Sequence, residues 1–171
     1  MIRTPRLFMR PVDPERDFAA MHAILSAPQA MAYWSTPPHD SEAQTREWLA
    51  AMAGIEPALG EDFIVEFEGR VIGKAGLYRF PELGYLLDPA VWGLGLGREA
   101  VQAVIARGFA VHGLPRLTAD VDPRNTASMR LLERLGFVET HRQARTWLVG
   151  DVWCDSVYYA LTREDWYQRT A

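Results

Sequence analysis

The chain contains 171 residues, of which 49% are hydrophobic and 23% charged, and its formal net charge is −4. This length is typical of one compact domain, and the composition is that of a globular protein rather than a disordered one. The mild negative charge argues against nucleic acid as the main partner, because no strongly basic domain is present to neutralise phosphates.

Cysteine and histidine usage narrows the class further. The single cysteine, Cys154, cannot form an internal disulfide or a site of several thiolates, which indicates a reducing compartment. The four histidines show no metal-ligand spacing, so we expect no metal. No stretch approaches the ~18 apolar residues of a membrane span, and no secretion signal is recognisable. We therefore expect a cytoplasmic domain without a membrane partner.

The N-terminal part predicts one strand and two helices. Residues 6–12 are typical of a short opening strand. Pro14 stands where the first turn of a helix tolerates a missing N–H, and apolar residues follow it at helical spacing. Residues 30–40 predict a loop. Ser41 followed by Gln44 is a capping-box pattern, which predicts a second helix that ends near residue 52.

The middle of the chain predicts three strands and a helix. Residues 63–67 and 71–78 form two alternating apolar runs on either side of a tight turn, which is the pattern of a hairpin. Residues 82–87 predict another strand. After a cluster of glycines, residues 98–111 carry apolar side chains at helical spacing.

The C-terminal part continues the alternation. Residues 117–121 predict a strand and residues 126–135 a short helix. Residues 137–149 and 152–161 predict two closing strands, and Thr162 could cap one last helical turn. Interleaved strands and helices predict an α/β domain.

A glycine-rich loop lies between the strand at 82–87 and the following helix. Gly93, Gly95 and Gly97 let backbone N–H groups converge, and the helix adds its positive end, so the loop predicts a cradle for a phosphate or pyrophosphate. Arg98 could add a charged contact. A Walker loop is excluded because Arg98 follows Gly97, and the spacing also differs from the dinucleotide fingerprint. A plain turn is the alternative.

Two segments in order resemble the motifs of one enzyme family. Residues 82–89 followed by residues 92–97 resemble motif A of the GNAT N-acetyltransferases, Q/R-x-x-G-x-G/A after a strand. Residues 122–137 resemble motif B, N-x-x-S/A ending in L-G-F. The opening residues 6–11 and residues 155–159 further resemble the RimJ/RimL-type branch. The resemblance covers essentially the whole chain, with Trp92 as a departure where many members carry Gln or Arg.

The resemblance implies a fold and a co-substrate. The fold would be a mixed, mostly antiparallel twisted sheet flanked by helices, splayed between the strands at 82–87 and 117–121 to admit acetyl-CoA. Asn125 would contact acetyl-CoA, and the strand end around Leu86 and Leu87 would pair with the pantetheine amides. The pyrophosphate would be held by Gly93, Leu94, Gly95, Leu96, Gly97 and Arg98. The acetyl group would move to a primary amine.

The predicted helix at 126–135 carries the candidate acid. Helical spacing places Asn125, Ser128 and Leu132 on one face. Many family members have a tyrosine at the position of Leu132, where it protonates the leaving thiolate. The resemblance makes Ser128 the candidate acid instead, unless its hydroxyl bonds its own helix backbone. Asn125 is a helix cap, a ligand contact or both.

The base is less well defined by the sequence. Glu82 precedes the strand that would face the cofactor, and its carboxylate could accept the amine proton through a water. Alternatively, Glu82 points to solvent. Glu139 and His141 compete for this role, so the sequence leaves the base open.

Aromatic residues mark a candidate acceptor groove. The resemblance places acceptor-binding residues near Tyr33 and Trp34, and Trp147 falls near the same groove on the closing strands. Such rings could grip an amine or a peptide terminus, although packing is the alternative for each. The acceptor could be a protein N-terminal α-amine or a small-molecule amine. Its nitrogen would attack the thioester directly, without a covalent enzyme intermediate.

Three further points stay open in the sequence. The missing tyrosine leaves an alternative function, a catalytically idle acyl-CoA-binding sensor or interaction module. The length of the accepted acyl chain is not defined by any residue pattern. The closing strands could pair across a homodimer.

Overall fold

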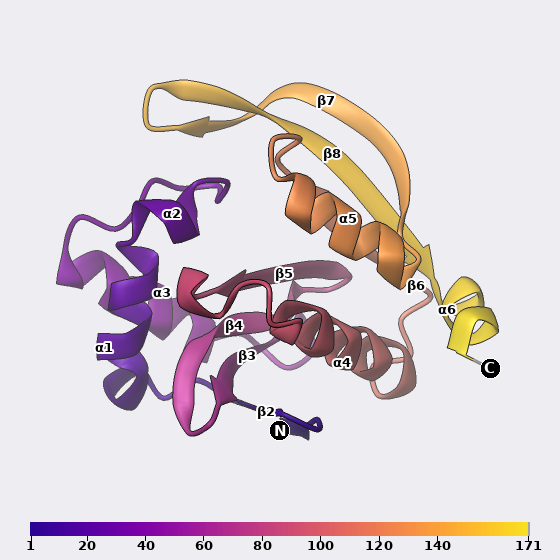
Figure 1. Cartoon of the computed structure of the whole chain (residues 1–171), viewed down its shortest axis with the longest axis horizontal. Coiled ribbons are helices and arrows are strands. Elements are labelled where there is room, and N and C mark those ends of the chain that lie inside the picture. Colours follow the sequence, from indigo (N-terminus) through magenta and orange to yellow (C-terminus); the bar gives the residue numbers. More distant parts are fainter. Residues whose placement is uncertain (171) are drawn as a thin grey trace.

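One eight-stranded sheet, in the order β1-β2-β3-β4-β5-β6-β8-β7, organises the computed structural model, which describes residues 1–170. Every neighbouring pair of strands is antiparallel except β5 and β6, which are parallel. Helices cover both faces of the sheet (Figure 1). The structure thus confirms the expected mixed, mostly antiparallel α/β fold.

The element bounds are as follows. The strands are β1 (Ile2–Arg3), β2 (Leu7–Arg10), β3 (Glu61–Phe67), β4 (Arg70–Arg79), β5 (Glu82–Leu87), β6 (Arg116–Val121), β7 (Val138–Val149) and β8 (Val152–Thr162). The helices are α1 (Pro14–Leu25), α2 (Pro28–Met31), α3 (Glu42–Ala53), α4 (Leu96–Ala110), α5 (Thr126–Leu135) and α6 (Arg163–Thr170), with a 3-10 turn η1 (Pro89–Val91).

Local sequence signals set several of these boundaries. Pro14 is the first residue of α1, whose N-cap is Asp13. Ser41 caps α3 by accepting a bond from the Gln44 backbone N–H, while the Gln44 side chain accepts from the Asp40 N–H rather than closing the box on Ser41. β5 and α5 have the predicted bounds.

Several elements differ from the predictions. β2 ends at Arg10 rather than at 12, and β3 begins at Glu61 rather than at 63. β1 was not expected, and α2 occupies the start of the segment expected to be a loop. α4 begins at Leu96, two residues early, because Gly95 in the left-handed region starts the helix directly after the loop. α6 has eight residues rather than a single turn.

The sheet separates two apolar cores. Along β3, Phe63 and Val65 face the core under α4 and α5, whereas Ile64 faces the core under α1, α2 and α3. This alternation is the period of two of a strand buried on both faces. A buried ion-pair network, in which Arg10 bonds Asp17 on α1 and Glu66 on β3, joins α1 to the sheet.

The two parallel strands β5 and β6 barely touch. Their register contains one residue pair, Glu82 opposite Thr118, and the Thr118 N–H donates to the Pro81 carbonyl at 3.0 Å. Beyond this pair the strands diverge, and β6, β8, β7 and α5 lie apart from the N-terminal part of the sheet (Figure 1). The expected splay between the strands at 82–87 and 117–121 is confirmed. We call this separation the seam.

Among residues 1–170, no helix has the length and apolar character needed to cross a bilayer. Within the same residues, no group of three or more histidine, cysteine, aspartate or glutamate side chains is arranged to hold a metal ion.

Candidate active site

The glycine loop has the backbone shape of an anion cradle. Gly93 and Gly95 adopt φ of 78° and 77°, in the left-handed region that side chains disfavour. Gly95 is the N-cap of α4 and offers no side-chain acceptor, so the first N–H groups of the helix are not capped from within. Uncapped N–H groups at a helix start favour a bound phosphate. Arg98 is exposed beside them.

Arg6 braces this loop from β2's side of the sheet. Its guanidinium donates to the Leu94 carbonyl at 2.8 Å and to the Glu99 carboxylate at 2.7 Å. Burial alone would raise the pKa of Glu99, but hydrogen bonds from Thr4 and Arg6 outweigh it, so that pKa lies below its usual value. The sequence analysis gave Arg6 no role, because its partners lie about ninety residues away.

The free edge of β5 at the seam differs in detail from the prediction. The Asp88 N–H bonds the Ile72 carbonyl on β4, so alternation directs the backbone groups of Leu86 toward β4 and those of Leu87 toward the seam. The Leu87 carbonyl there accepts from the Trp92 indole at 2.9 Å. By the same alternation, Tyr85 rather than Leu86 supplies the second free backbone pair.

The start of α5 positions the predicted acid. The Asn125 side chain caps the helix by accepting from the Ser128 N–H at 3.1 Å, so its cap role is confirmed. Leu132, where many family members carry a tyrosine, is fully buried in the core. No phenol therefore projects from this helix at that position.

A phenol reaches Ser128 from the opposite side of the seam. The Tyr85 hydroxyl on β5 lies 2.5 Å from the Ser128 Oγ. Burial raises the pKa of Tyr85 to about 12, although the bond with Ser128 acts in the other direction. Tyr85 was not among the predicted site residues. The signal for it was its alternation with Leu83 and Leu87, which places all three side chains on the α5 face of β5.

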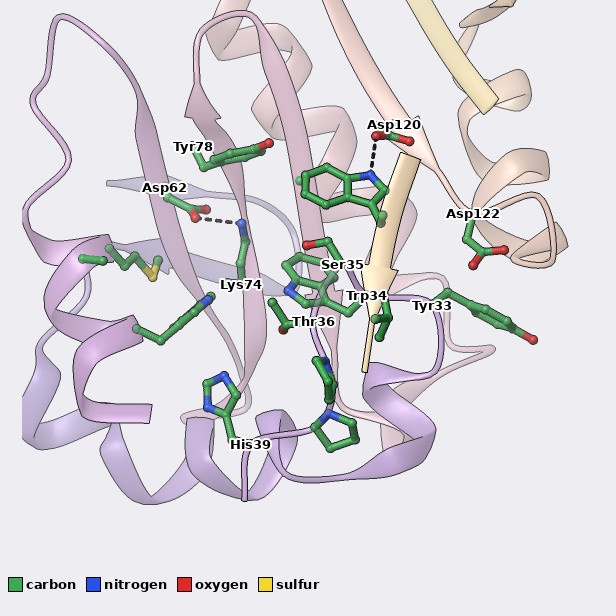
Figure 2. Close-up of a pocket in the computed structure, with 18 of the residues that line it drawn as sticks. Tyr33, Trp34, Ser35, Thr36, His39, Asp62, Lys74, Tyr78, Asp120 and Asp122 are labelled. Carbon is green, nitrogen blue, oxygen red and sulfur yellow. Dashed lines mark hydrogen bonds and ion pairs between the residues drawn. The ribbon is translucent and has the colours of Figure 1, made fainter. Parts of the chain in front are cut away.

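On the other face of the sheet, the loop after α2, the helix α3 and the β7–β8 hairpin enclose a pocket of about 940 Å³. Figure 2 shows labelled side chains from the loop and from strands β3, β4 and β6 around it. The residues proposed for the acceptor, Tyr33, Trp34 and Trp147, all line this pocket. The structure thus brings these three residues together, although Trp147 lies more than one hundred positions from the other two in sequence.

A buried ion pair lies in the pocket wall. Lys74 on β4 donates to the Asp62 carboxylate on β3 at 2.7 Å, and both side chains are 3% exposed (Figure 2). Lys74 also lies over the rings of Trp34 and Tyr78, at 5.7 and 5.5 Å. Burial raises the pKa of Asp62, against the opposing effect of Lys74. A lone lysine within an apolar strand was the sequence signal for this pair.

Asp120 is a second carboxylate that the sequence analysis missed. It lies on β6 at the seam, on the pocket side, because Leu117, Ala119 and Val121 face the opposite core. One of its oxygens accepts from the Trp147 indole at 2.9 Å, which ties the hairpin to β6 (Figure 2). The other carboxylate oxygen of Asp120 has no hydrogen-bond partner among the described residues.

Glu82 also lines the pocket, at the single β5–β6 contact. Its carboxylate accepts from the exposed Arg79 guanidinium at 2.7 Å. Burial and Glu82 together raise the pKa of Tyr78 well above its usual value.

The competing base candidates lie elsewhere. Glu139 pairs with Arg142 on the exposed strand β7, and His141 stacks on Tyr158. Neither lines the pocket. Of the three carboxyl or imidazole candidates from the sequence, only Glu82 therefore faces the place where an amine could enter.

The pocket is strongly acidic. Seven carboxylates line it against two cations, a net formal charge of −5, whereas the whole chain carries −4. The carboxylates are Asp40, Glu47, Asp62, Glu82, Asp120, Asp122 and Asp155, and the cations are Lys74 and Arg79. The negative charge of the protein is thus concentrated around this pocket, which favours a positively charged ligand.

Known acetyltransferases are similar to this chain in sequence and in structure. The family described as "Acetyltransferase (GNAT) domain" matches residues 6–138. The uncharacterized N-acetyltransferase p20 of Bacillus licheniformis is 32% identical over 143 residues, which cover 78% of this chain and 80% of that protein. The ribosomal protein uS5-alanine N-acetyltransferase of Escherichia coli (strain K12) is 39% identical over 107 residues, 58% of this chain and 55% of that protein. A crystal structure of a GNAT-family acetyltransferase from Bacillus anthracis superposes with a TM-score of 0.81 at 27% identity, covering 95% of this chain and 98% of that one.

Proposed function

Because the chain belongs to the GNAT acetyltransferase family and is an acetyl-CoA-dependent acyltransferase, we propose that it acetylates a primary amine held in the acidic pocket. The observation that carries this proposal is the seam. On one face β5 contacts Trp92 beside the glycine loop and Ser128 on α5, and on the other face its first residues line the pocket. An amine and a thioester could therefore meet through the opening without either crossing the sheet.

The residues around the seam fit acetyl-CoA, which supplies an activated acetyl group when bound. The uncapped N–H groups from Gly95 to Arg98 would hold its pyrophosphate. The backbone groups of Tyr85 and the N–H of Leu87, which face the seam, would pair with amides of its pantetheine arm, as another strand would. The Asn125 amide N–H₂ has no bond recorded among residues 1–170 and is available to a ligand.

Two side chains on opposite faces supply the acid and the base in this proposal. Glu82 on the pocket side accepts the proton that the amine loses, directly or through a water. Ser128 on the α5 side offers its hydroxyl to the departing sulfur. Attack by the amine is direct in this proposal, because no carboxylate or imidazole among residues 1–170 contacts the Ser128 hydroxyl to activate it as a nucleophile.

The charge of the pocket supports an amine acceptor. A primary amine reaches the protein largely as an ammonium ion at neutral pH, and unpaired carboxylates attract it. The aromatic rings of Trp34, Tyr78 and Trp147 could contact such a cation over their faces. Both acceptor classes, a protein N-terminal α-amine and a small-molecule amine, remain within the proposal. The relative from Escherichia coli is named for the first class.

The first test is a calorimetric titration of acetyl-CoA into wild type and into Gly95→Trp. We expect micromolar binding by wild type, and loss of binding in the variant because its side chain blocks the approach of a pyrophosphate to the loop. Gly69→Trp is the matched control, since Gly69 has a φ of 75° and open space around it in the distant β3–β4 turn.

The second test measures the release of free CoA thiol from acetyl-CoA in the presence of spermidine or of a hexapeptide that begins with alanine. Turnover that disappears in Ser128→Ala and Glu82→Gln would support the enzyme over the idle acyl-CoA sensor. Failure of wild type to bind acetyl-CoA would overturn both. Binding without turnover of either amine would exclude these two acceptors and direct the search to other primary amines.

A further inference from the structure

The phenol missing from α5 has a counterpart on β5. Resting on the proposed function, we propose that Tyr85 is a positioning residue that donates its hydroxyl proton to Ser128 and so directs the Ser128 proton toward the departing sulfur. Tyr85 acts through Ser128. Only Ser128 touches the reacting group.

The geometry places the two hydroxyls across the seam. Tyr85 extends from β5 and Ser128 from the first turn of α5, and their oxygens are 2.5 Å apart. Beyond the pair Glu82–Thr118, β5 and β6 no longer pair. This hydrogen bond therefore joins the two sides of the seam, between the pocket and the face covered by α5.

The direction of the hydrogen bond follows from acidity. Each hydroxyl carries one proton, and a phenol is a much stronger hydrogen-bond donor than an aliphatic alcohol. Burial raises the pKa of Tyr85 to about 12, so the phenol keeps its proton throughout the working pH range. With Tyr85 as donor, the Ser128 oxygen accepts, and its own proton must point elsewhere.

The helix does not capture that proton. In the described part of the chain, the Ser128 Oγ accepts no other hydrogen bond, and it donates none to a backbone carbonyl of α5. The backbone N–H of Ser128 is bound by Asn125, which fixes the residue at the start of the helix. Asn125 thus fixes the Ser128 backbone and Tyr85 holds the Ser128 oxygen, so that the Ser128 proton is left available to a sulfur in the seam.

The proton balance of the step is complete. The amine nitrogen forms a bond to the acetyl carbon, and the bond from that carbon to sulfur breaks with its electron pair on sulfur. The ammonium ion has already lost one proton to solvent, and the proton that the nitrogen releases after attack goes to Glu82 or water. The sulfur receives a hydrogen bond and then a proton from Ser128. The Tyr85 O–H stabilises the Ser128 oxygen by its hydrogen bond, and solvent returns a proton to that oxygen.

The first experiment needs no acceptor. The affinities of CoA and desulfo-CoA are measured by calorimetry between pH 7 and pH 9 for wild type, Tyr85→Phe, Ser128→Ala and the control Tyr167→Phe. Tyr167 lies on the exposed C-terminal helix. Donors aimed at the sulfur stabilise the thiolate and lower the pKa of the bound thiol. The ratio of CoA affinity to desulfo-CoA affinity should then rise with pH by about tenfold in wild type and Tyr167→Phe.

In Tyr85→Phe and Ser128→Ala this ratio should change less than about twofold over the same range. An equal pH dependence in all four proteins would overturn the inference while leaving the proposed function intact. Absence of CoA binding by wild type would overturn the inference and the proposed function together. Should Tyr85→Phe fail to fold, Ser128→Ala tests the same pair from its other side.

The second experiment measures turnover with whichever amine supports thiol release. Tyr85→Phe should lower kcat about tenfold to a hundredfold with little change in KM for acetyl-CoA. The double variant Tyr85→Phe/Ser128→Ala should be no slower than Ser128→Ala, because Tyr85 acts only through Ser128. Additive losses in the double variant, or a Tyr85→Phe enzyme with wild-type kcat, would contradict the assigned role.

Discussion

At the residue scale, the structure uses buried charges in two different ways. Arg10 and Asp17 form a pair behind α1, where Arg10 also binds Glu66. Lys74 and Asp62 form a pair in the wall of the acidic pocket. The first pair joins a helix to the sheet, while the second joins two strands of the sheet at the pocket wall. We therefore expect loss of the first pair to lower stability alone, and loss of the second to weaken acceptor binding as well, under the proposed function.

Asp17→Asn tests the structural pair. Burial alone would raise the pKa of Asp17, but hydrogen bonds from Arg10 and the Asp13 backbone outweigh it, so the pKa lies below its usual value. Its contribution to stability is present above about pH 4 and is lost as pH falls through the folded-state pKa. We expect Asp17→Asn to cost about 3 kcal/mol at pH 7, a drop in Tm of roughly 10 °C.

The measurement is thermal unfolding followed by circular dichroism from pH 2 to pH 7. The difference in Tm between Asp17→Asn and wild type should shrink at the acid end, because wild type then loses the same interaction. Glu15→Gln, on the exposed surface of the same helix, is the control and should leave Tm within a degree or two. A constant difference at every pH would contradict this account.

At the element scale, the structure shows what sequence can and cannot predict. β5 and α5 have their predicted bounds, because a proline, a capping asparagine and a terminal glycine mark the ends of these elements in the sequence. α2 was missed because four residues do not show a helical period. The glycine loop could be predicted from neighbouring residues. The bonds of Tyr85 with Ser128 and of Trp147 with Asp120 could not, since only the tertiary arrangement of β5 against α5 and of the β7–β8 hairpin against β6 brings those residues together.

Asn125 allows the cap and the ligand role to be separated on one element. Asn125→Ala removes the acceptor for the Ser128 N–H and should cost about 1 kcal/mol of stability. Asn125→Asp keeps a capping oxygen, so Tm should stay close to wild type, but it removes the N–H₂ donor. If the donor binds acetyl-CoA, calorimetry will show weaker binding by Asn125→Asp at unchanged Tm. Unchanged affinity would limit Asn125 to its cap.

The β7–β8 hairpin supplies a similar comparison for the acceptor. Trp147 bonds Asp120 and lines the pocket, whereas Trp153 lies outside the pocket beneath Arg145. Trp147→Phe should raise KM for the amine several-fold, because the hairpin loses its bond to β6, with no change in acetyl-CoA affinity. Trp153→Phe is the matched control. Steady-state kinetics in which both variants behave alike would contradict a specific role for Trp147.

At the scale of the whole molecule, the sheet consists of two groups of strands that meet at one residue pair. The core under α4 and α5 continues across the seam and keeps the two groups together. A ligand that occupies the seam would add contacts to both groups at once. Binding should therefore be coupled to the stability of the entire domain rather than to one loop.

Saturating CoA should raise the Tm of the intact domain. A ligand present at 100 times its Kd stabilises the folded state by about 2.7 kcal/mol, which corresponds to roughly 5–10 °C for a chain of this size. Differential scanning calorimetry at several CoA concentrations measures the shift. Gly95→Trp should show none of it, whereas Gly69→Trp should shift like wild type.

The seam also reverses the usual pattern of amide hydrogen exchange in a sheet. Central strands ordinarily exchange slowest and edge strands fastest, since pairing on both sides protects an amide. Here the amides of Tyr85 and Leu87 belong to a central strand but point into the seam. Their deuterium uptake should be fast in the free protein and slow with CoA present. The middle of the sheet would then report occupancy of the site as directly as any change in activity.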